Sequence, residues 1–263
     1  MSNKTAVQLY TVREFTKTAK DLAETLIKVS KIGYTAVQVS AVAAMRGDSP
    51  EVDAVLMKKM LDDNGLKCIA THRSWDNLVD NIDSEIDFHH TLECDFAAIG
   101  GIPHTYASTH EGYRDWIKDV NPIISKLKSA GIQFGHHNHS KEFFRPQRHQ
   151  PTLEDILIDE GGADLMMELD LYWIQHAGVN AERILERCAG RVPVIHLKDK
   201  EIIPGSNDSR IAPIGEGVID WENIIPTCEK AGVKWYAVEQ DTCYRDPFDC
   251  LQSSYDYLTS MGL

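Results

Sequence analysis

The stretch of sequence that decides the fold is Gly131-Ile132-Gln133-Phe134-Gly135-His136-His137-Asn138-His139. It begins with a glycine, continues with a short apolar run, and ends in three histidines and an asparagine, with Glu142 close behind. A glycine directly before a strand is typical of a helix-to-strand joint, because only glycine takes the left-handed conformation there without steric cost. Histidines at the end of a strand contribute little to a hydrophobic core. The polar end is therefore either a solvated loop or part of a site.

The same pattern of a glycine before a short apolar run recurs along the chain, and each instance predicts another strand. The instances are Gly33 before 34–39, Gly65 before 66–70, Gly162 before 163–169, Gly190 before 192–197 and Gly232 before 233–238. Two further strands are predicted at 5–10 and 95–99. Together with the strand that starts at Ile132, the sequence predicts eight strands.

Amphipathic stretches separate the predicted strands. In 19–31, Leu22, Leu26, Ile27 and Val29 are predicted to share one side of a helix. Similar helices are predicted at 53–64, 112–130, 152–160, 181–189, 221–231 and 247–261, with a less clear one at 75–92. Eight strands each followed by a helix predict an α/β fold, a (β/α)8 TIM barrel, as a single domain over residues 1–263. An open doubly wound sheet would carry a glycine-rich phosphate turn after its first strand, and residues 7–13 have none.

Composition limits the partners and the compartment. The net charge of −13 argues against a nucleic-acid backbone or an anionic membrane as the partner. The six cysteines show no CxxC spacing and indicate reduced thiols. We find neither a signal-peptide pattern nor an apolar run of about 18 residues that could span a bilayer. The expectation is a cytoplasmic protein; self-association into a homo-oligomer stays open.

Polar residues end the last four predicted strands, and strand periodicity aligns them. The active site of such a barrel lies at the carboxyl ends of its strands, and residues two apart point the same way. Any one of these residues alone is more often a helix cap, a core histidine or half of an ion pair. Four in register at successive strands predict a metal site. The aligned pairs are His137 with His139, Glu168 with Asp170, His196 with Lys198, and Glu239 with Asp241.

Six stretches carry a family resemblance. They are Val7-Gln-Leu-Tyr-Thr-Val-Arg13, His137-Asn-His-Ser-Lys-Glu-Phe143, Glu168-Leu-Asp-Leu-Tyr-Trp173, His196-Leu-Lys-Asp199, Gly215-Glu-Gly-Val-Ile-Asp-Trp221 and Glu239-Gln-Asp-Thr242. On these stretches the chain resembles the xylose isomerase-like barrels, in particular the sugar phosphate isomerase/epimerase group. Epimerases of that group hold one divalent ion with Glu, Asp, His and Glu on strands five to eight.

The resemblance implies one divalent ion (Mn, Mg, Zn or Co) in this chain. Asp170, His196 and Glu239 match the last three ligands of the family. At the first position this chain departs from the family pattern and offers His137 in the register of the strand, with Glu142 as the alternative. The predicted ligands are therefore His137, Asp170, His196 and Glu239.

The predicted ligands imply proton-transfer chemistry on a sugar. An ion that chelates a carbonyl oxygen and the neighbouring hydroxyl stabilises an enediolate. We predict that Glu239 removes the proton and that His139 or Glu142 returns it, which gives isomerisation or epimerisation. Loss of an adjacent hydroxyl or glycosidic oxygen from the same enediolate would give dehydration or elimination.

Weaker predictions concern the substrate and a lid. Lys198 is expected to stabilise an enediolate oxygen or a phosphate, and His72 and Trp173 are expected to contact the sugar. Arg210 and Glu216 lie in a long irregular stretch, 199–220, which predicts a lid.

The sequence thus predicts a metal-dependent sugar isomerase or epimerase acting on a ketose or keto-sugar, with a small-molecule sugar as its partner. The first alternative is a dehydratase or lyase on an inosose or a 3-keto-glycoside. An apurinic endonuclease would need a basic face, which the charge of −13 disfavours. A non-catalytic carbohydrate-binding barrel is the fourth possibility.

Overall fold

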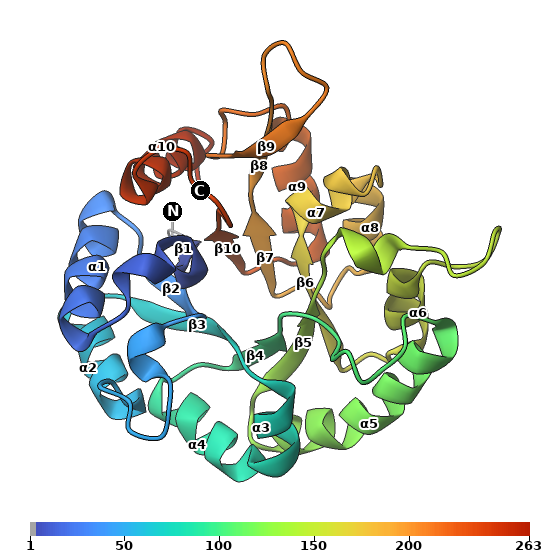
Figure 1. The fold of residues 1–263 in the computed structure, drawn as a ribbon, viewed down its shortest axis with the longest axis horizontal. Coiled ribbons are helices and arrows are strands. Elements are labelled where there is room, and N and C mark those ends of the chain that lie inside the picture. The colour runs from blue at the N-terminus through green and yellow to red at the C-terminus, as the bar shows by residue number, and fades with distance from the viewer. Residues whose placement is uncertain (1–3) are drawn as a thin grey trace.

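Eight parallel strands close into a barrel, with helices forming a ring outside it (Figure 1). The computed structural model describes residues 4–263. The strands follow the order β1-β10-β7-β6-β5-β4-β3-β2, and the predicted single-domain TIM barrel is confirmed. Their bounds are Thr5–Gln8 for β1, Ala36–Val39 for β2, Lys67–His72 for β3, Phe96–Ile99 for β4, Gln133–His137 for β5, Leu165–Asp170 for β6, Val194–Leu197 for β7 and Trp235–Val238 for β10.

The predicted glycine joints are confirmed. All six glycines have a positive φ, from 64° at Gly65 to 121° at Gly33. Gly232 shows the reason, because it ends α9 (Trp221–Ala231) in the left-handed conformation with φ of 88° and its backbone N–H bonds the last turn of that helix. The chain can then reverse directly into the next strand.

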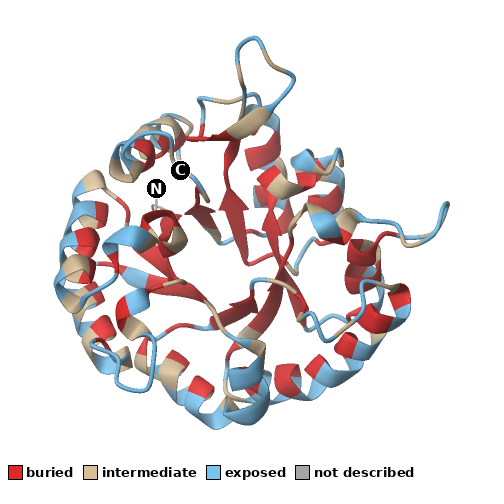
Figure 2. Cartoon of the chain, viewed as in Figure 1, coloured by how far each residue is buried: buried red, intermediate tan, exposed pale blue. Residues whose placement is uncertain are grey.

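Ten α-helices of the described chain cover the barrel and bury their inner faces against it (Figures 1 and 2). In α1, Leu22, Leu26 and Val29 are fully buried, as predicted, but Ile27 is 41% exposed. Its placement on the buried side was wrong, because each residue of a helix turns about 100° from the one before it. The less clear helix at 75–92 is two helices, α3 and α4. Their bounds are Ala19–Ile32 for α1, Ala54–Asp63 for α2, Trp75–Asp80 for α3, Ile82–Thr91 for α4, His110–Ser129 for α5, Leu153–Glu160 for α6, Leu171–His176 for α7, Ala181–Arg187 for α8, Trp221–Ala231 for α9 and Pro247–Ser260 for α10.

The stretch 199–220 was predicted to be irregular, and this prediction is wrong. It contains an antiparallel hairpin of β8 (Asp199–Ile202) and β9 (Ser209–Ala212), which projects from the rim after β7 (Figure 1). Asp199 fixes its base: Oδ2 accepts hydrogen bonds from the backbone N–H of Gly215 and from Trp221 Nε1, both at 2.8 Å. A buried carboxylate therefore ties the hairpin to the start of α9.

Two composition-based expectations can be compared with the described residues. None of their helices combines the length and the apolar character that crossing a bilayer requires. All six cysteines are free thiols, as predicted.

Candidate metal centre

Four side chains at the ends of adjacent strands converge as the sequence predicts. We call His137, Asp170, His196 and Glu239 the outer group. Each offers one ligand atom, these atoms lie within 4.8 Å of one another, and all four residues are buried. The parallel register explains the convergence, because Asp170 of β6 lies beside His196 of β7 and Glu239 directly follows β10. Two imidazoles and two carboxylates fit a divalent transition-metal ion.

The two carboxylate oxygens of Asp170 make different contacts. Its Oδ1 accepts the backbone N–H of Trp173 at 2.9 Å and so caps the start of α7. Its Oδ2 faces the outer group, 3.9 Å from His137 Nε2 and 3.9 Å from His196 Nδ1. The cap fixes the carboxylate and keeps its second oxygen directed at the outer group.

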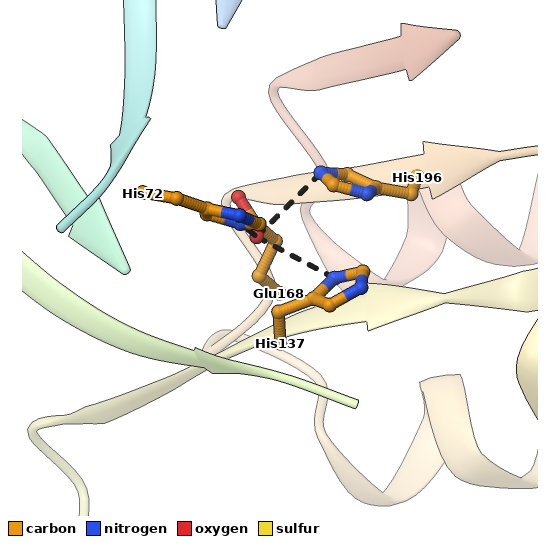
Figure 3. A group of neighbouring side chains, drawn as sticks. All are labelled: His72, His137, Glu168 and His196. Carbon is orange, nitrogen blue, oxygen red and sulfur yellow. Dashed lines mark hydrogen bonds and ion pairs between the residues drawn. The ribbon is translucent and has the colours of Figure 1, made fainter. Parts of the chain in front are cut away.

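A second cluster lies against the first. We call His72, His137, Glu168 and His196 the inner group, whose ligand atoms also lie within 4.8 Å of one another. Figure 3 shows the three imidazoles converging on the carboxylate of Glu168. Its Oε2 lies 2.5 Å from His72 Nε2, 3.6 Å from His137 Nδ1 and 3.5 Å from His196 Nε2. Gln38 Nε2 donates to its Oε1 at 2.9 Å.

Sequence reasoning missed the role of Glu168. The spacing put it in register with Asp170 and gave it no function. The signal that could have found it is the polar end of the third strand, since His72 reaches Glu168 from across the barrel.

Lys198 contacts both carboxylates of the outer group. Its Nζ lies 2.8 Å from Asp170 Oδ2, 2.8 Å from Glu239 Oε2 and 2.9 Å from Asp241 Oδ2. Burial would lower the pKa of Lys198, but these three carboxylates outweigh it and raise the pKa. The side chain was predicted to meet the substrate. Only about 1% of it is exposed, so its direct contacts are with the carboxylates.

The charges of the two groups compensate one another. Burial alone would raise the pKa of Glu168, yet His72 and His196 lower it to about 2. Burial opposes the charge on His196, but Glu168 and Glu239 raise its pKa to about 10. Asp170 differs, since burial dominates and raises its pKa to about 6 in spite of Lys198. The site therefore holds a nearly balanced set of buried charges.

His139 and Glu142 follow the end of β5. Burial, Lys198 and Lys141 lower the pKa of His139 to about 4, so its imidazole is neutral near pH 7. Glu142 is fully buried and its Oε2 accepts the backbone N–H of His139 at 2.9 Å. Among the described residues, Glu142 belongs to neither metal-compatible group. The structure therefore places His137, and not the alternative Glu142, beside the other predicted ligands.

A cavity of about 380 Å³ opens beside the outer group. His72, His137, His139 and Glu239 are among its lining residues, together with Tyr10, Ser40, Arg46, Arg73 and Asp241. The Trp173 ring lies 5.8 Å from the ring of His139 and 5.6 Å from Lys198 Nζ. The predicted substrate contacts His72 and Trp173 therefore lie at or near the site.

The predicted lid residues are held in ion pairs of their own. Arg210 pairs with Glu201 across the hairpin, at 2.7 Å, and stacks on Tyr244. Glu216 pairs with Arg245 at 2.5 Å. In this arrangement both side chains stabilise the hairpin and its contact with the segment before α10.

Solved structures of other proteins have a fold similar to this barrel, among them the following three. A sugar phosphate isomerase/epimerase from Parabacteroides distasonis has a TM-score of 0.80 at 22% identity, over 99% of this chain and 95% of that one. The probable 3-DHS dehydratase AsbF from Bacillus anthracis has a TM-score of 0.71 at 11% identity, over 97% and 98%. The IOLI protein, solved with a zinc atom, has a TM-score of 0.72 at 14% identity, over 98% and 97%.

Identities this low establish a shared fold and do not transfer an activity. No curated protein sequence matches the chain significantly. The family model described as xylose isomerase-like TIM barrel matches residues 26–258. With most of its length matched, the chain belongs to the xylose isomerase-like TIM barrel family.

Proposed function

We propose that this protein is a metal-dependent isomerase or epimerase that acts on a ketose or keto-sugar through an enediolate. The observation that supports the proposal is the outer group, in which four adjacent strands bring two imidazoles and two carboxylates to the edge of a cavity. When bound there, a divalent ion would polarise a sugar carbonyl and lower the energy of the enediolate by several kcal/mol. Mn²⁺, Zn²⁺ and Co²⁺ fit this mixed donor set better than Mg²⁺, which prefers oxygen ligands.

Glu239 is the proposed base. It lines the cavity, and its pKa is lowered because Lys198 and His196 outweigh the effect of burial. The carboxylate is thus ionised at neutral pH and ready to accept a proton from the carbon next to the carbonyl. The contacts of Oε2 with Lys198 and His196, at 2.8 and 2.7 Å, fix its direction.

His139 is the proposed partner that returns the proton. It lines the same cavity, and its Nδ1 makes no hydrogen bond within the described structure. The neutral imidazole can carry a proton at one nitrogen and accept at the other. Glu142 contributes through the backbone of His139 and holds that residue in place.

The position of Glu142 keeps the lyase alternative open. With Glu142 directed to the backbone, the outer group offers one carboxylate to the cavity, Glu239, and the opposite proton transfer depends on the imidazole of His139. That imidazole can equally protonate a departing hydroxyl or glycosidic oxygen. A dehydratase or lyase acting on an inosose or a 3-keto-glycoside is therefore the second candidate.

Solvent exchange tests both candidates. The purified protein, loaded with Mn²⁺, Co²⁺ or Zn²⁺, is incubated in D2O with a panel of ketoses and 3-keto-glycosides and followed by NMR. We expect deuterium at the carbon next to the carbonyl of at least one sugar, dependent on the metal. A product with changed configuration supports the isomerase, and release of water or an aglycone supports the lyase. Absence of exchange in every sugar with every metal would refute the proposal.

A further inference from the structure

The inner and outer groups share two histidines but use opposite nitrogens of each ring. His137 turns Nδ1 toward Glu168 at 3.6 Å and Nε2 toward Asp170 at 3.9 Å. His196 turns Nε2 toward Glu168 at 3.5 Å and Nδ1 toward Asp170 at 3.9 Å. The same two nitrogens hydrogen-bond Gln38 Oε1 at 2.8 Å and Glu239 Oε2 at 2.7 Å, respectively. The two rings therefore stand between the two groups.

This arrangement makes the groups mutually exclusive for a metal ion. An imidazole that releases a proton to bind an ion has one nitrogen with a free lone pair, because the other nitrogen keeps its proton. When His137 and His196 direct their lone pairs to the inner group, the outer group keeps only Asp170 and Glu239. The reverse choice leaves the inner group with His72 and Glu168.

We propose that the inner group is a second cation site, selective for Zn²⁺ or Co²⁺, whose occupation withdraws both histidines from the outer group. The ligands would be His72 Nε2, His137 Nδ1, Glu168 Oε2 and His196 Nε2. Three imidazoles and one carboxylate are a nitrogen-rich set that favours zinc or cobalt over manganese or magnesium.

The geometry suits a four-coordinate ion. With metal–ligand bonds of about 2.0–2.1 Å, neighbouring ligand atoms of a tetrahedral site lie roughly 3.3 Å apart. The distances from Glu168 Oε2 to His137 and His196 are 3.6 and 3.5 Å, and Figure 3 shows the rings facing that oxygen. The 2.5 Å contact between His72 and Glu168 would open by less than an ångström.

The inner group also lacks the competitor that the outer group contains. Lys198 Nζ lies 2.8 Å from an oxygen of Asp170 and of Glu239, so an ion in the outer group meets a positive charge at its own ligands. Among the described ion pairs of Glu168, every partner is a histidine. Gln38, whose Nε2 donates to the other oxygen of Glu168, is neutral. Its Oε1 lies 2.8 Å from His196 Nε2, so an ion bound at that nitrogen replaces this hydrogen bond.

A consequence follows for regulation. Zn²⁺ in the inner group would inhibit a reaction that depends on Mn²⁺ in the outer group, and excess Mn²⁺ would relieve the inhibition. This consequence rests on the proposed function, whereas the existence of the inner site does not.

Metal titration of matched variants tests the site without an activity assay. Zn²⁺ and Mn²⁺ dissociation constants are measured by competition with a chromogenic chelator for wild type, Glu168→Gln and Asp170→Asn, with the buried Glu154→Gln as the control. We expect Glu168→Gln to weaken Zn²⁺ binding at least tenfold more than Mn²⁺ binding, and Asp170→Asn to show the reverse order. The inner site is overturned if each variant weakens Zn²⁺ and Mn²⁺ binding equally. It is also overturned if Asp170→Asn weakens the binding of both ions and Glu168→Gln weakens neither.

A measurement on the wild-type chain guards against variants that fail to fold. Anomalous diffraction at the zinc edge, from crystals loaded with Zn²⁺, locates the ion directly. An ion within about 2.2 Å of Glu168 Oε2 is the expected result, and an ion bound to Asp170 and Glu239 overturns the proposal. Failure of sugar exchange with every metal would refute the proposed function and leave this test unchanged.

Discussion

The ammonium nitrogen of Lys198 lies 2.8 Å from Oε2 of Glu239, the carboxylate that we propose as the base. The same nitrogen lies 2.8 Å from Oδ2 of Asp170. Two of the four outer ligands thus already share a buried positive charge, which substitutes for part of the charge of a divalent ion. Lys198 and the metal therefore compete for the same oxygens.

Replacing Lys198 by methionine separates its two effects. Lys198→Met leaves buried carboxylates unpaired, which costs roughly 3–5 kcal/mol and should lower the melting temperature of the metal-free protein by on the order of 10 °C. The dissociation constant for Mn²⁺ should fall at least tenfold, because the repelling ammonium is gone. Calorimetric melting with and without Mn²⁺ measures both. Lys141→Met, at a lysine whose side chain is 58% exposed, is the control. An unchanged Mn²⁺ affinity in Lys198→Met would contradict the competition.

Removing the proposed base should abolish exchange and spare the fold. Glu239→Gln keeps the shape of the side chain but cannot accept the proton, so metal-dependent deuterium exchange should fall by about 10²–10⁴-fold. Glu201→Gln, in the ion pair of the hairpin, should keep wild-type exchange. NMR of the sugar gives the rates and circular dichroism checks the fold. Exchange above a tenth of the wild-type rate in Glu239→Gln would assign the base elsewhere.

The buried carboxyl of Glu154 predicts a dependence of stability on pH. Burial, and then the charge of Glu142, raises the pKa of Glu154 well above 4.5, and neither of its oxygens has a hydrogen-bond partner within the described structure. The folded state thus keeps a proton that the unfolded chain releases near pH 4.5. The contribution of Glu154 to stability is therefore highest below pH 4.5 and falls above it, by up to about 1.4 kcal/mol per pH unit, until the folded pKa is reached.

Glu154→Gln removes this loss, because an amide does not ionise. Its melting temperature should exceed that of wild type at pH 8, and the difference should shrink toward pH 4. Glu24→Gln, at a glutamate whose side chain is 60% exposed, should follow wild type at every pH. A constant difference between Glu154→Gln and wild type across this range would mean that packing, not ionisation, controls the effect.

The barrel could be predicted from sequence because its signals are local. Glycine before an apolar run marks a joint within a few residues, and Gly33 and Gly232 have the positive φ that this pattern predicts. The outer group was also predictable, since each member ends its own strand and adjacent strands fix the register. Asp170 shows that the cap and ligand interpretations are compatible, because each uses a different oxygen.

The inner group depends on distances that no local pattern encodes. His72 and Glu168 are 96 residues apart and lie on strands that are not neighbours in the barrel. Their contact follows from barrel closure and from side-chain directions across the interior. The hairpin was missed for a different reason: β8 and β9 have four residues each and follow β7 without a glycine joint.

Asp199 should control the order of that hairpin. Its carboxylate accepts four hydrogen bonds, from the backbone N–H groups of Lys200, Gly215 and Ile219 and from Trp221 Nε1. Asp199→Ala leaves these donors without their acceptor, which should cost roughly 2–4 kcal/mol. Because two of the donors lie between the hairpin and α9 and a third is the first residue of α9, the loss should appear first as local opening. Limited proteolysis should cleave residues 203–208 faster in Asp199→Ala than in wild type, with Asp208→Ala as a control that removes only a bond within the turn. Equal cleavage rates in Asp199→Ala and wild type would show that strand pairing alone holds the hairpin.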